Sequence, residues 1–168
     1  MNVYIPLAIG QIIPDEVYSG IKNQSVFCDI VEVATEGVVD SQRNYSSDRW
    51  RGECRSRNEI ISLMGDDKDD VAVWMDRDLA LTDTGTFHSM LHYLQEHPNC
   101  GAVGVHYKNE ASHNHVACCC LMIKIKPLLD IIFRGKQGCC CNEVRNHLTV
   151  KGYTIEYLDK QTHGEEIL

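Results

Sequence analysis

The sequence predicts an α/β domain of three layers, in which helices flank a central and mainly parallel sheet. Two observations lead to this class. Short runs of β-branched and aromatic residues alternate along the chain with segments that carry helix signals. Repeated strand–helix–strand units of this kind place helices on both faces of a sheet. The 168 residues, of which 43% are hydrophobic, show no internal repeat and no clear linker, so residues 1–168 are expected to form one domain.

The first half of the chain is predicted to contain three strands and two helices. The strand signals lie at residues 3–7, 27–34 and 71–75. Pro14 suits the first turn of a helix that continues to Asn23. A second helix is expected from Asp48 until Gly65 stops it. The polar residues 38–48 are expected to form a loop before this second helix.

The second of these helices carries an arginine on its buried face. Its apolar stripe consists of Trp50, Cys54, Ile61 and Met64. Arg57 lies on the same stripe, and an arginine that faces the interior needs an anionic partner. The sequence leaves three possibilities for Arg57 open: an internal ion pair with a carboxylate, a side chain that extends to solvent, and a contact with the phosphate of a ligand.

The second half of the chain is predicted to alternate in the same way. Asp83, Thr84 or Thr86 can cap a helix that ends before Pro98. The buried side of this helix is expected to hold Phe87, Met90, Leu91 and Leu94. Further strands are expected at 101–105, 117–125 and 153–158, and further helices at 127–135 and 142–151. Residues 159–168 are predicted to be a short polar tail.

Composition and charge exclude several classes of protein. The formal net charge is −8, and the one short basic cluster lies between Arg51 and Arg57, so nucleic acid is not an expected partner. No apolar run approaches the roughly 20 residues that a membrane-spanning helix requires. The first residues also lack the basic region of a signal peptide. We therefore expect a cytoplasmic protein without a membrane span.

The nine cysteines include two triplets, at 118–120 and 139–141. Adjacent cysteines bridge each other only with strain, and a chain without an export signal is expected to keep its thiols reduced. The cysteines of zinc sites are usually separated by a few residues, a spacing that neither triplet has. We therefore expect these cysteines to be small buried side chains and not metal ligands.

The triplet Asp76-Arg77-Asp78 carries the strongest functional signal. It directly follows the apolar strand 71–75, and α/β proteins bind ligands at the carboxyl ends of their strands. Two carboxylates this close together need a cation to offset their repulsion. Such oxygen ligands suit Mg²⁺ or Mn²⁺, which neutralises the phosphates of a bound ligand. Because the chain has no Gly-rich phosphate loop, a metal-bridged diphosphate is the expected ligand.

Several segments, in their order along the chain, resemble family 2 glycosyltransferases, whose nucleotide-sugar-binding domain has the GT-A fold. Val3-Tyr4-Ile5-Pro6 resembles the family's first strand, and Ile30 to Gly37 resembles its second strand. Ser56-Arg57-Asn58 is similar to its Ala-Arg-Asn signature, and Asp76-Arg77-Asp78 is similar to its metal-binding aspartates. His97 to Gly104 resembles a helix end with the following strand, and Gly152-Tyr153-Thr154-Ile155 resembles the Gly-Tyr strand. The resemblance covers most of the chain and implies a compact, Rossmann-like GT-A domain.

The resemblance also implies a site for each part of a nucleotide diphosphate sugar. The metal, Mn²⁺ or Mg²⁺, would be held on the diphosphate by Asp76, Asp78 and His163. The nucleotide, expected to be a uridine or guanosine form, would be lined by Pro6, Glu36, Arg57 and Asp76. The implied activity is transfer of a hexose from this donor to a hydroxyl group of an unknown glycan, lipid or protein acceptor.

One segment departs from the family pattern. Inverting members place a Glu-Asp pair, whose aspartate is the general base, at the position that Cys140-Cys141 occupies here. A neutral thiol replaces a carboxylate poorly. Glu143, two residues further on, matches another acidic position of that family segment, so the resemblance implies it as the candidate base if the loop shifts. The family's acceptor site is often shaped by a longer C-terminal region, which these 168 residues are not expected to supply. Acceptor binding by a partner or a second subunit is therefore one open alternative.

Two other functions stay open from the sequence. The thiols at the position of the base favour a non-catalytic module of the same fold that binds a nucleotide sugar or a partner. A nucleotidyltransferase also uses metal-bound aspartates on a similar sheet. The lack of a Gly-rich or Lys-bearing phosphate loop argues against this second alternative.

Overall fold

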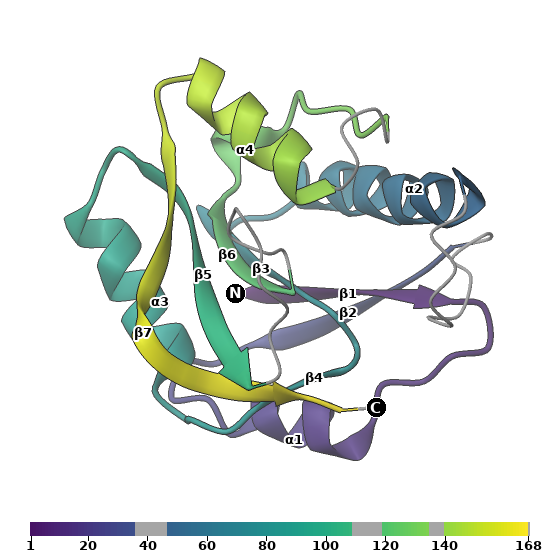
Figure 1. Cartoon of the computed structure of the whole chain (residues 1–168), viewed down its shortest axis with the longest axis vertical. Coiled ribbons are helices and arrows are strands. Elements are labelled where there is room, and N and C mark those ends of the chain that lie inside the picture. The colour runs from purple at the N-terminus through teal and green to yellow at the C-terminus, as the bar shows by residue number, and fades with distance from the viewer. Residues whose placement is uncertain (36–46, 109–118, 135–139, 168) are drawn as a thin grey trace.

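The structure is a computed structural model that describes residues 1–35, 47–108, 119–134 and 140–167 (Figure 1). The strands within these residues are β1 (Asn2–Ala8), β2 (Asp29–Thr35), β3 (Val71–Met75), β4 (Leu79–Leu81), β5 (Cys100–Lys108), β6 (Cys120–Lys124) and β7 (Thr154–Glu166). The helices are α1 (Asp15–Lys22), α2 (Ser47–Met64), α3 (Thr86–Glu96) and α4 (Cys140–Val150), with the short 3-10 helix η1 (Lys126–Leu128). None of these helices is long and apolar enough to cross a membrane.

The described strands form one sheet in the order β2-β1-β3-β6-β5-β7-β4. Strand β1 runs parallel to β2 and β3, and β5 runs parallel to β7. Strand β6 is antiparallel to both of its neighbours, and β4 is antiparallel to β7. The sheet is therefore mixed, and the prediction of a mainly parallel sheet is wrong. Residues 109–119 separate β5 from β6, and parallel strands need a longer crossover, so this connection suits an antiparallel pair.

Alternation along the strands separates two cores, one on each face of the sheet. Val3, Ile5 and Leu7 of β1 pack in one hydrophobic cluster, whereas Tyr4 packs in the other. Helices α1 and α3 cover the first cluster, and α2 and α4 cover the second. Figure 1 shows α2 and α1 on opposite sides of β1 and β2. The predicted three layers are thus present, with helices on both faces of the sheet.

The helices begin and end close to the predicted positions. The N-cap of α1 is Pro14, and α2 ends at Met64, directly before Gly65. Gly152 follows α4 with a φ of 82°, a left-handed conformation that favours glycine. The predicted helix 127–135 is reduced to the single turn of η1. Residues 38–46 of the predicted loop lie outside the described part of the chain.

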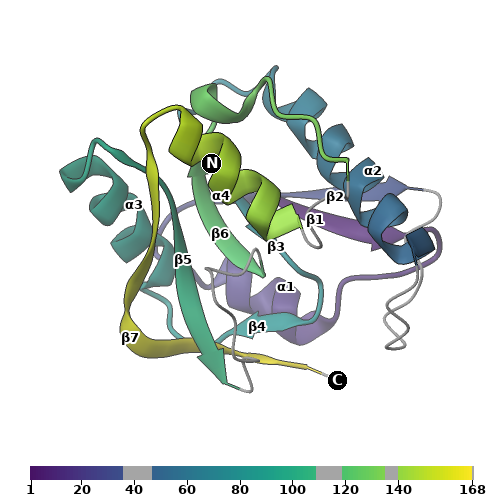
Figure 2. The same ribbon diagram turned by 45° about the horizontal axis from the view of Figure 1, so that its top comes forward.

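The C-terminal segment differs most from the sequence prediction, because β7 continues to Glu166 and is not followed by a polar tail. Its second half pairs with β4, with Gly164 opposite Leu81 and Glu165 opposite Ala80. Figure 2 shows β7 bending as it passes toward β4. A Cβ atom on Gly164 would lie 2.6 Å from the carbonyl oxygen of Ala80, so only glycine permits this close approach.

Candidate functional site

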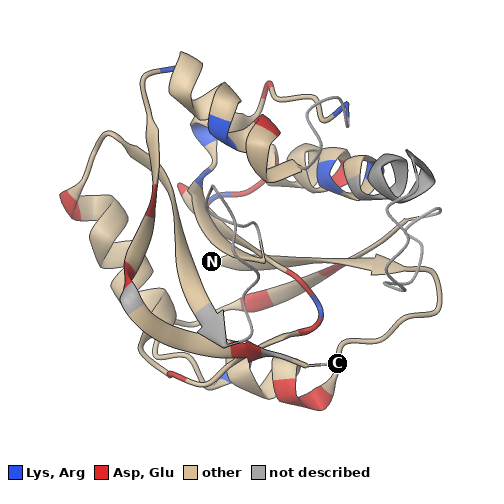
Figure 3. Cartoon of the chain, viewed as in Figure 1, with Lys and Arg blue, Asp and Glu red and all other residues tan. Residues whose placement is uncertain are grey.

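The acidic triplet forms a tight turn at the carboxyl end of β3. The N–H of Asp76 donates to the carbonyl of Cys119 at 2.8 Å, which ties the turn to the start of β6. The N–H of Leu79 donates to the carbonyl of Asp76 at 3.3 Å and closes the turn before β4. Figure 3 shows red, blue and red in succession on the coil between β3 and β4. Both predicted aspartates therefore lie at the sheet edge where the sequence placed them.

Arg57 reaches this turn from α2. Its Nη2 atom donates to Oδ1 of Asp76 at 3.0 Å, and its guanidinium lies 5.1 Å from the centroid of the Trp74 ring. The arginine side chain is 2% exposed, whereas that of Asp76 is 35% exposed. The prediction that Arg57 faces the interior is confirmed, and an internal carboxylate is its partner in this structure. Trp74, which sequence reasoning treated only as a core residue, contributes the aromatic face behind the guanidinium.

Pro6 lies at the same level of the sheet as Asp76. Strands β1 and β3 pair with Tyr4 opposite Trp74, so two residues later both strands reach Pro6 and Asp76. Pro6 also lies opposite Val33 of β2. Three of the residues predicted for nucleotide binding, which are Pro6, Arg57 and Asp76, therefore come from β1, α2 and β3 to one edge of the sheet. The fourth, Glu36, lies outside the described residues.

His163 is buried in a different polar cluster. Its Nδ1 atom lies 3.1 Å from Oγ1 of Thr86 and 3.4 Å from Oδ2 of Asp83. Its Nε2 atom lies 3.0 Å from Oδ1 of Asp159. The side chain is 4% exposed, so these partners surround a ring that solvent hardly reaches. Sequence reasoning identified Asp83 and Thr86 only as helix-capping residues and did not identify Asp159.

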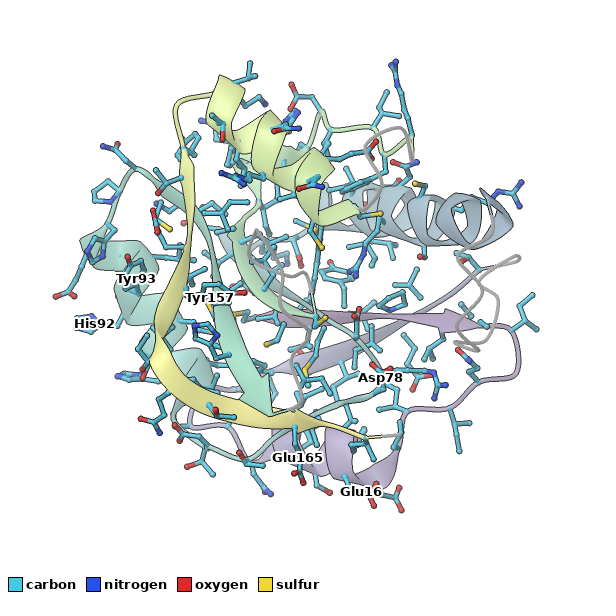
Figure 4. The ribbon with its side chains drawn as sticks, in the orientation of Figure 1. Glu16, Asp78, His92, Tyr93, Tyr157 and Glu165 are labelled. Atoms are coloured by element: carbon cyan, nitrogen blue, oxygen red, sulfur yellow. The ribbon has the colours of Figure 1, made fainter. Side chains whose placement is uncertain are left out.

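The strand register explains why His163 does not join the two aspartates. The N–H of Ile167 donates to the carbonyl of Asp78, whereas the carbonyl of His163 accepts from Thr82. Since a strand rises about 3.3 Å per residue, His163 lies about 13 Å along β7 from Ile167. Figure 4 labels Asp78 and Glu165, and Glu165 pairs with Ala80 of β4. The predicted ligand set of Asp76, Asp78 and His163 is therefore not assembled here.

The two aspartates alone suit a hard cation that takes most of its ligands from elsewhere. Within the described part of the chain, no group of three or more His, Cys, Asp or Glu side chains is arranged to hold a metal. Mg²⁺ is usually bound through one or two carboxylates together with water and substrate phosphates, not by a complete protein cage. Asp76 and Asp78, on a turn that is partly exposed to solvent, match that mode of binding.

Glu143, the candidate base, lies in the first turn of α4 and is 8% exposed. Its two carboxylate oxygens lie 3.0 and 3.3 Å from the backbone nitrogen of Arg134, which donates to them. Asn58 exchanges two hydrogen bonds with the backbone of Phe133, at 2.9 and 3.1 Å, and so fixes the same segment to α2. Glu143 also lines a surface cavity of about 450 Å³ between α4 and residues 130–134. In this structure the carboxylate organises that segment.

Most cysteines that the structure describes are buried, whereas Cys119 and Cys141 are half-buried. Cys120 and Cys140 are each 1% exposed, as expected for small core side chains. Burial raises the pKa of the Cys120 thiol to about 12, and the nearby charge of Asp76 adds to that rise. The Cys120 thiol is therefore neutral at pH 7 and a poor nucleophile. Cys118 and Cys139 lie outside the described residues.

Comparisons with known proteins show the fold. No protein-family model and no curated protein matches the sequence. The crystal structure of S. aureus TarS superposes with a TM-score of 0.64 at 13% identity, over 99% of this chain and 36% of TarS. Mannosyltransferase PcManGT from Pyrobaculum calidifontis, in complex with GDP-Man and Mn²⁺, gives 0.68 at 13% identity, over 98% of this chain and 56% of that protein.

A third solved structure has a length closer to that of this chain. A197 from STIV superposes with a TM-score of 0.57 at 13% identity, over 95% of this chain and 81% of A197. By contrast, the chain spans less than two thirds of the length of the TarS and PcManGT structures. At these identities the likeness shows the fold alone, which the chain shares with TarS, PcManGT and A197.

Proposed function

We propose that this chain is a metal-dependent glycosyltransferase domain that binds a nucleotide diphosphate sugar at the carboxyl edge of β1 and β3. The observation that supports this most is the turn Asp76-Arg77-Asp78 at that edge, with Arg57 on Asp76 and Pro6 on the adjacent strand. Solved structures of the same fold hold such ligands. PcManGT was solved with GDP-Man and Mn²⁺, and TarS with UDP and with UDP-GlcNAc.

The chemistry divides between the metal and the side chains of this chain. Mn²⁺ or Mg²⁺, when bound at Asp76 and Asp78, would neutralise the diphosphate as a leaving group. Arg57 positions the carboxylate of Asp76 before any ligand arrives, because its guanidinium donates a hydrogen bond to that carboxylate. The buried ring of Trp74 lies against the guanidinium and holds it in place. Such prior positioning of charged groups is the main way in which a site of this kind lowers a barrier.

The base that would deprotonate the acceptor remains a prediction for Glu143. Its carboxylate already accepts the N–H of Arg134, and thiols occupy positions 140 and 141. These two observations favour the second candidate function, a nucleotide-sugar-binding module that does not transfer the sugar. Both candidates use the same donor site, so they differ only in turnover.

Thermal unfolding with nucleotides tests the donor site. We expect UDP or GDP to raise the unfolding temperature in the presence of Mn²⁺ and to have little effect with EDTA. The variant D78N should lose this response, whereas D66N should keep it. Asp66 is an exposed aspartate in the loop before β3, at the opposite edge of the sheet, and serves as the matched control. No Mn²⁺-dependent stabilisation by either nucleotide would contradict the proposed site.

Donor hydrolysis separates the enzyme from the binding module. We expect slow release of the sugar from UDP-sugar or GDP-sugar donors in the presence of Mn²⁺, because water replaces the unknown acceptor. The variant E143Q tests the base: loss of hydrolysis with unchanged nucleotide binding would support it. A wild-type chain that binds the donor with Mn²⁺ and releases no sugar would favour the binding module.

A further inference from the structure

The ion pair between Arg57 and Asp76 places a positive charge directly on one of the two proposed metal ligands. The guanidinium donates to Oδ1 of Asp76 at 3.0 Å and lies over the ring of Trp74 at 5.1 Å. Arg57 is 2% exposed, and Trp74 is fully buried, so packing holds the charge in place. Asp76 is 35% exposed and therefore meets solvent on its other side.

This arrangement changes what a divalent cation encounters at the turn. Asp76 and Asp78 carry two negative charges, whereas Arg57 and the intervening Arg77 carry two positive charges, of which that of Arg57 lies on Asp76. A cation that approaches Asp76 also approaches a fixed guanidinium, and burial limits the screening of that repulsion. A nucleoside diphosphate brings negative charge of its own and offsets both cations.

We propose that Arg57 makes metal binding at Asp76 and Asp78 dependent on the diphosphate, so that metal and nucleotide bind together. This inference rests on the proposed function and states how its site is regulated. The free chain holds Asp76 through the guanidinium and binds the metal weakly. When a diphosphate is present, its charge compensates Arg57, and Asp76 and Asp78 would then hold the metal more tightly. Arg57 acts through Asp76 and is a positioning residue.

The coupling is reciprocal and therefore measurable from either ligand. If the diphosphate raises the affinity for the metal by some factor, the metal raises the affinity for the diphosphate by the same factor. A coupling of this kind usually amounts to between about 5-fold and 150-fold. A direct titration of Mn²⁺ measures it without any need for turnover.

The test is a titration of Mn²⁺, followed by the electron paramagnetic resonance signal of the free ion, with and without saturating UDP or GDP. The full chain is compared with R57M, R57K and R55M. R55M is the matched control, because Arg55 is an exposed arginine on the same helix and undergoes the same chemical change. R57K keeps the charge at the site. Circular dichroism establishes that each variant is folded.

We expect UDP or GDP to raise the Mn²⁺ affinity of the wild-type chain by about tenfold or more. R57M should bind Mn²⁺ alone about tenfold more tightly than the wild type and respond less to nucleotide. R57K and R55M should behave like the wild type. Should R57M not fold, R57Q replaces it in the same titration, since it also removes the charge and keeps a hydrogen-bond donor.

Two results would overturn the inference. One is a wild-type chain that binds Mn²⁺ equally well with and without the nucleotide that it binds. The other is a folded R57M whose affinity for Mn²⁺ alone matches that of R55M. A wild-type chain that binds neither nucleotide with Mn²⁺ contradicts the proposed function as well, so the two failures are distinguishable.

Discussion

The substitution D76N removes one carboxylate from the proposed metal site and also breaks the ion pair with Arg57. The substitution D66N makes the same chemical change at an exposed aspartate in the loop before β3. We therefore expect D76N to abolish Mn²⁺-dependent nucleotide binding and to destabilise the ligand-free chain. D66N should do neither.

The magnitude follows from the exposure of the two partners. Removing one partner of a buried pair costs about 3–5 kcal/mol, whereas an exposed pair contributes about 0–1 kcal/mol. Arg57 is 2% exposed, but Asp76 is 35% exposed, and asparagine keeps an oxygen that accepts the hydrogen bond. After this discount for solvent screening, we expect D76N to lower the free energy of unfolding by about 2 kcal/mol.

Thermal and urea unfolding measure this difference in the absence of metal and nucleotide. For a domain of this size, about 2 kcal/mol corresponds to a decrease of about 4–8 °C in the unfolding temperature. D66N should lower it by less than half as much. Equal decreases for the two variants, or no decrease for D76N, would show that the Arg57–Asp76 pair does not contribute to stability.

Three further variants test other parts of the structure. G164A should cost about 1–3 kcal/mol in urea unfolding, because its Cβ would lie 2.6 Å from the Ala80 carbonyl oxygen, whereas G85A, with its nearest contact at 3.4 Å, should cost less. H163N should bind UDP with Mn²⁺ with an affinity within about twofold of the wild type, since His163 is distant from Asp78. A tenfold loss of affinity would instead support His163 as a metal ligand. Burial and the hydrogen bond to Asp67 raise the pKa of Tyr4 to about 12, so the stability that depends on neutral Tyr4 should be present below pH 10 and lost between pH 10 and 12. That part of the alkaline loss in urea unfolding should be absent from Y4F, and an unchanged pH profile would contradict it.

The sequence was sufficient where a signal is local. The apolar run of β3 and the acidic triplet after it lie where predicted, since a buried strand and its end are read from consecutive residues. The inward orientation of Arg57 followed from the helical period of its stripe. Its partner did not, because the contact with Asp76 joins residues 19 positions apart and depends on how α2 packs on the sheet.

The sequence was insufficient where structure depends on pairing between distant segments. Strand β4 has only three residues, and its partner in β7 lies more than eighty residues along the chain. The polar residues of β7 after Leu158 form a strand because their backbone pairs with β4 and β5, not because of their side chains. The antiparallel direction of β6 could have been predicted, because the sequence indicated no crossover helix between β5 and β6.

The position of His163 in the structure differs from the predicted position beside Asp76 and Asp78 for a specific reason. Between β5 and β7 the register passes from Gly104 opposite Tyr157 to His106 opposite Thr162. Strand β7 therefore contains extra residues at this point, and the bulge brings Asp159 to the ring of His163. Counting residues from the last predicted strand to a histidine does not reveal such a bulge.

A crystal structure of the chain with Mn²⁺ and UDP or GDP, with the anomalous signal of manganese recorded, tests the proposed donor site most directly. We expect one manganese peak at bonding distance from a carboxylate oxygen of Asp78, with the diphosphate on the same ion. Arg57 should still lie against Asp76 in that complex. A nucleotide bound elsewhere on the chain, or manganese without contact to either aspartate, would contradict the donor site proposed at the end of β3.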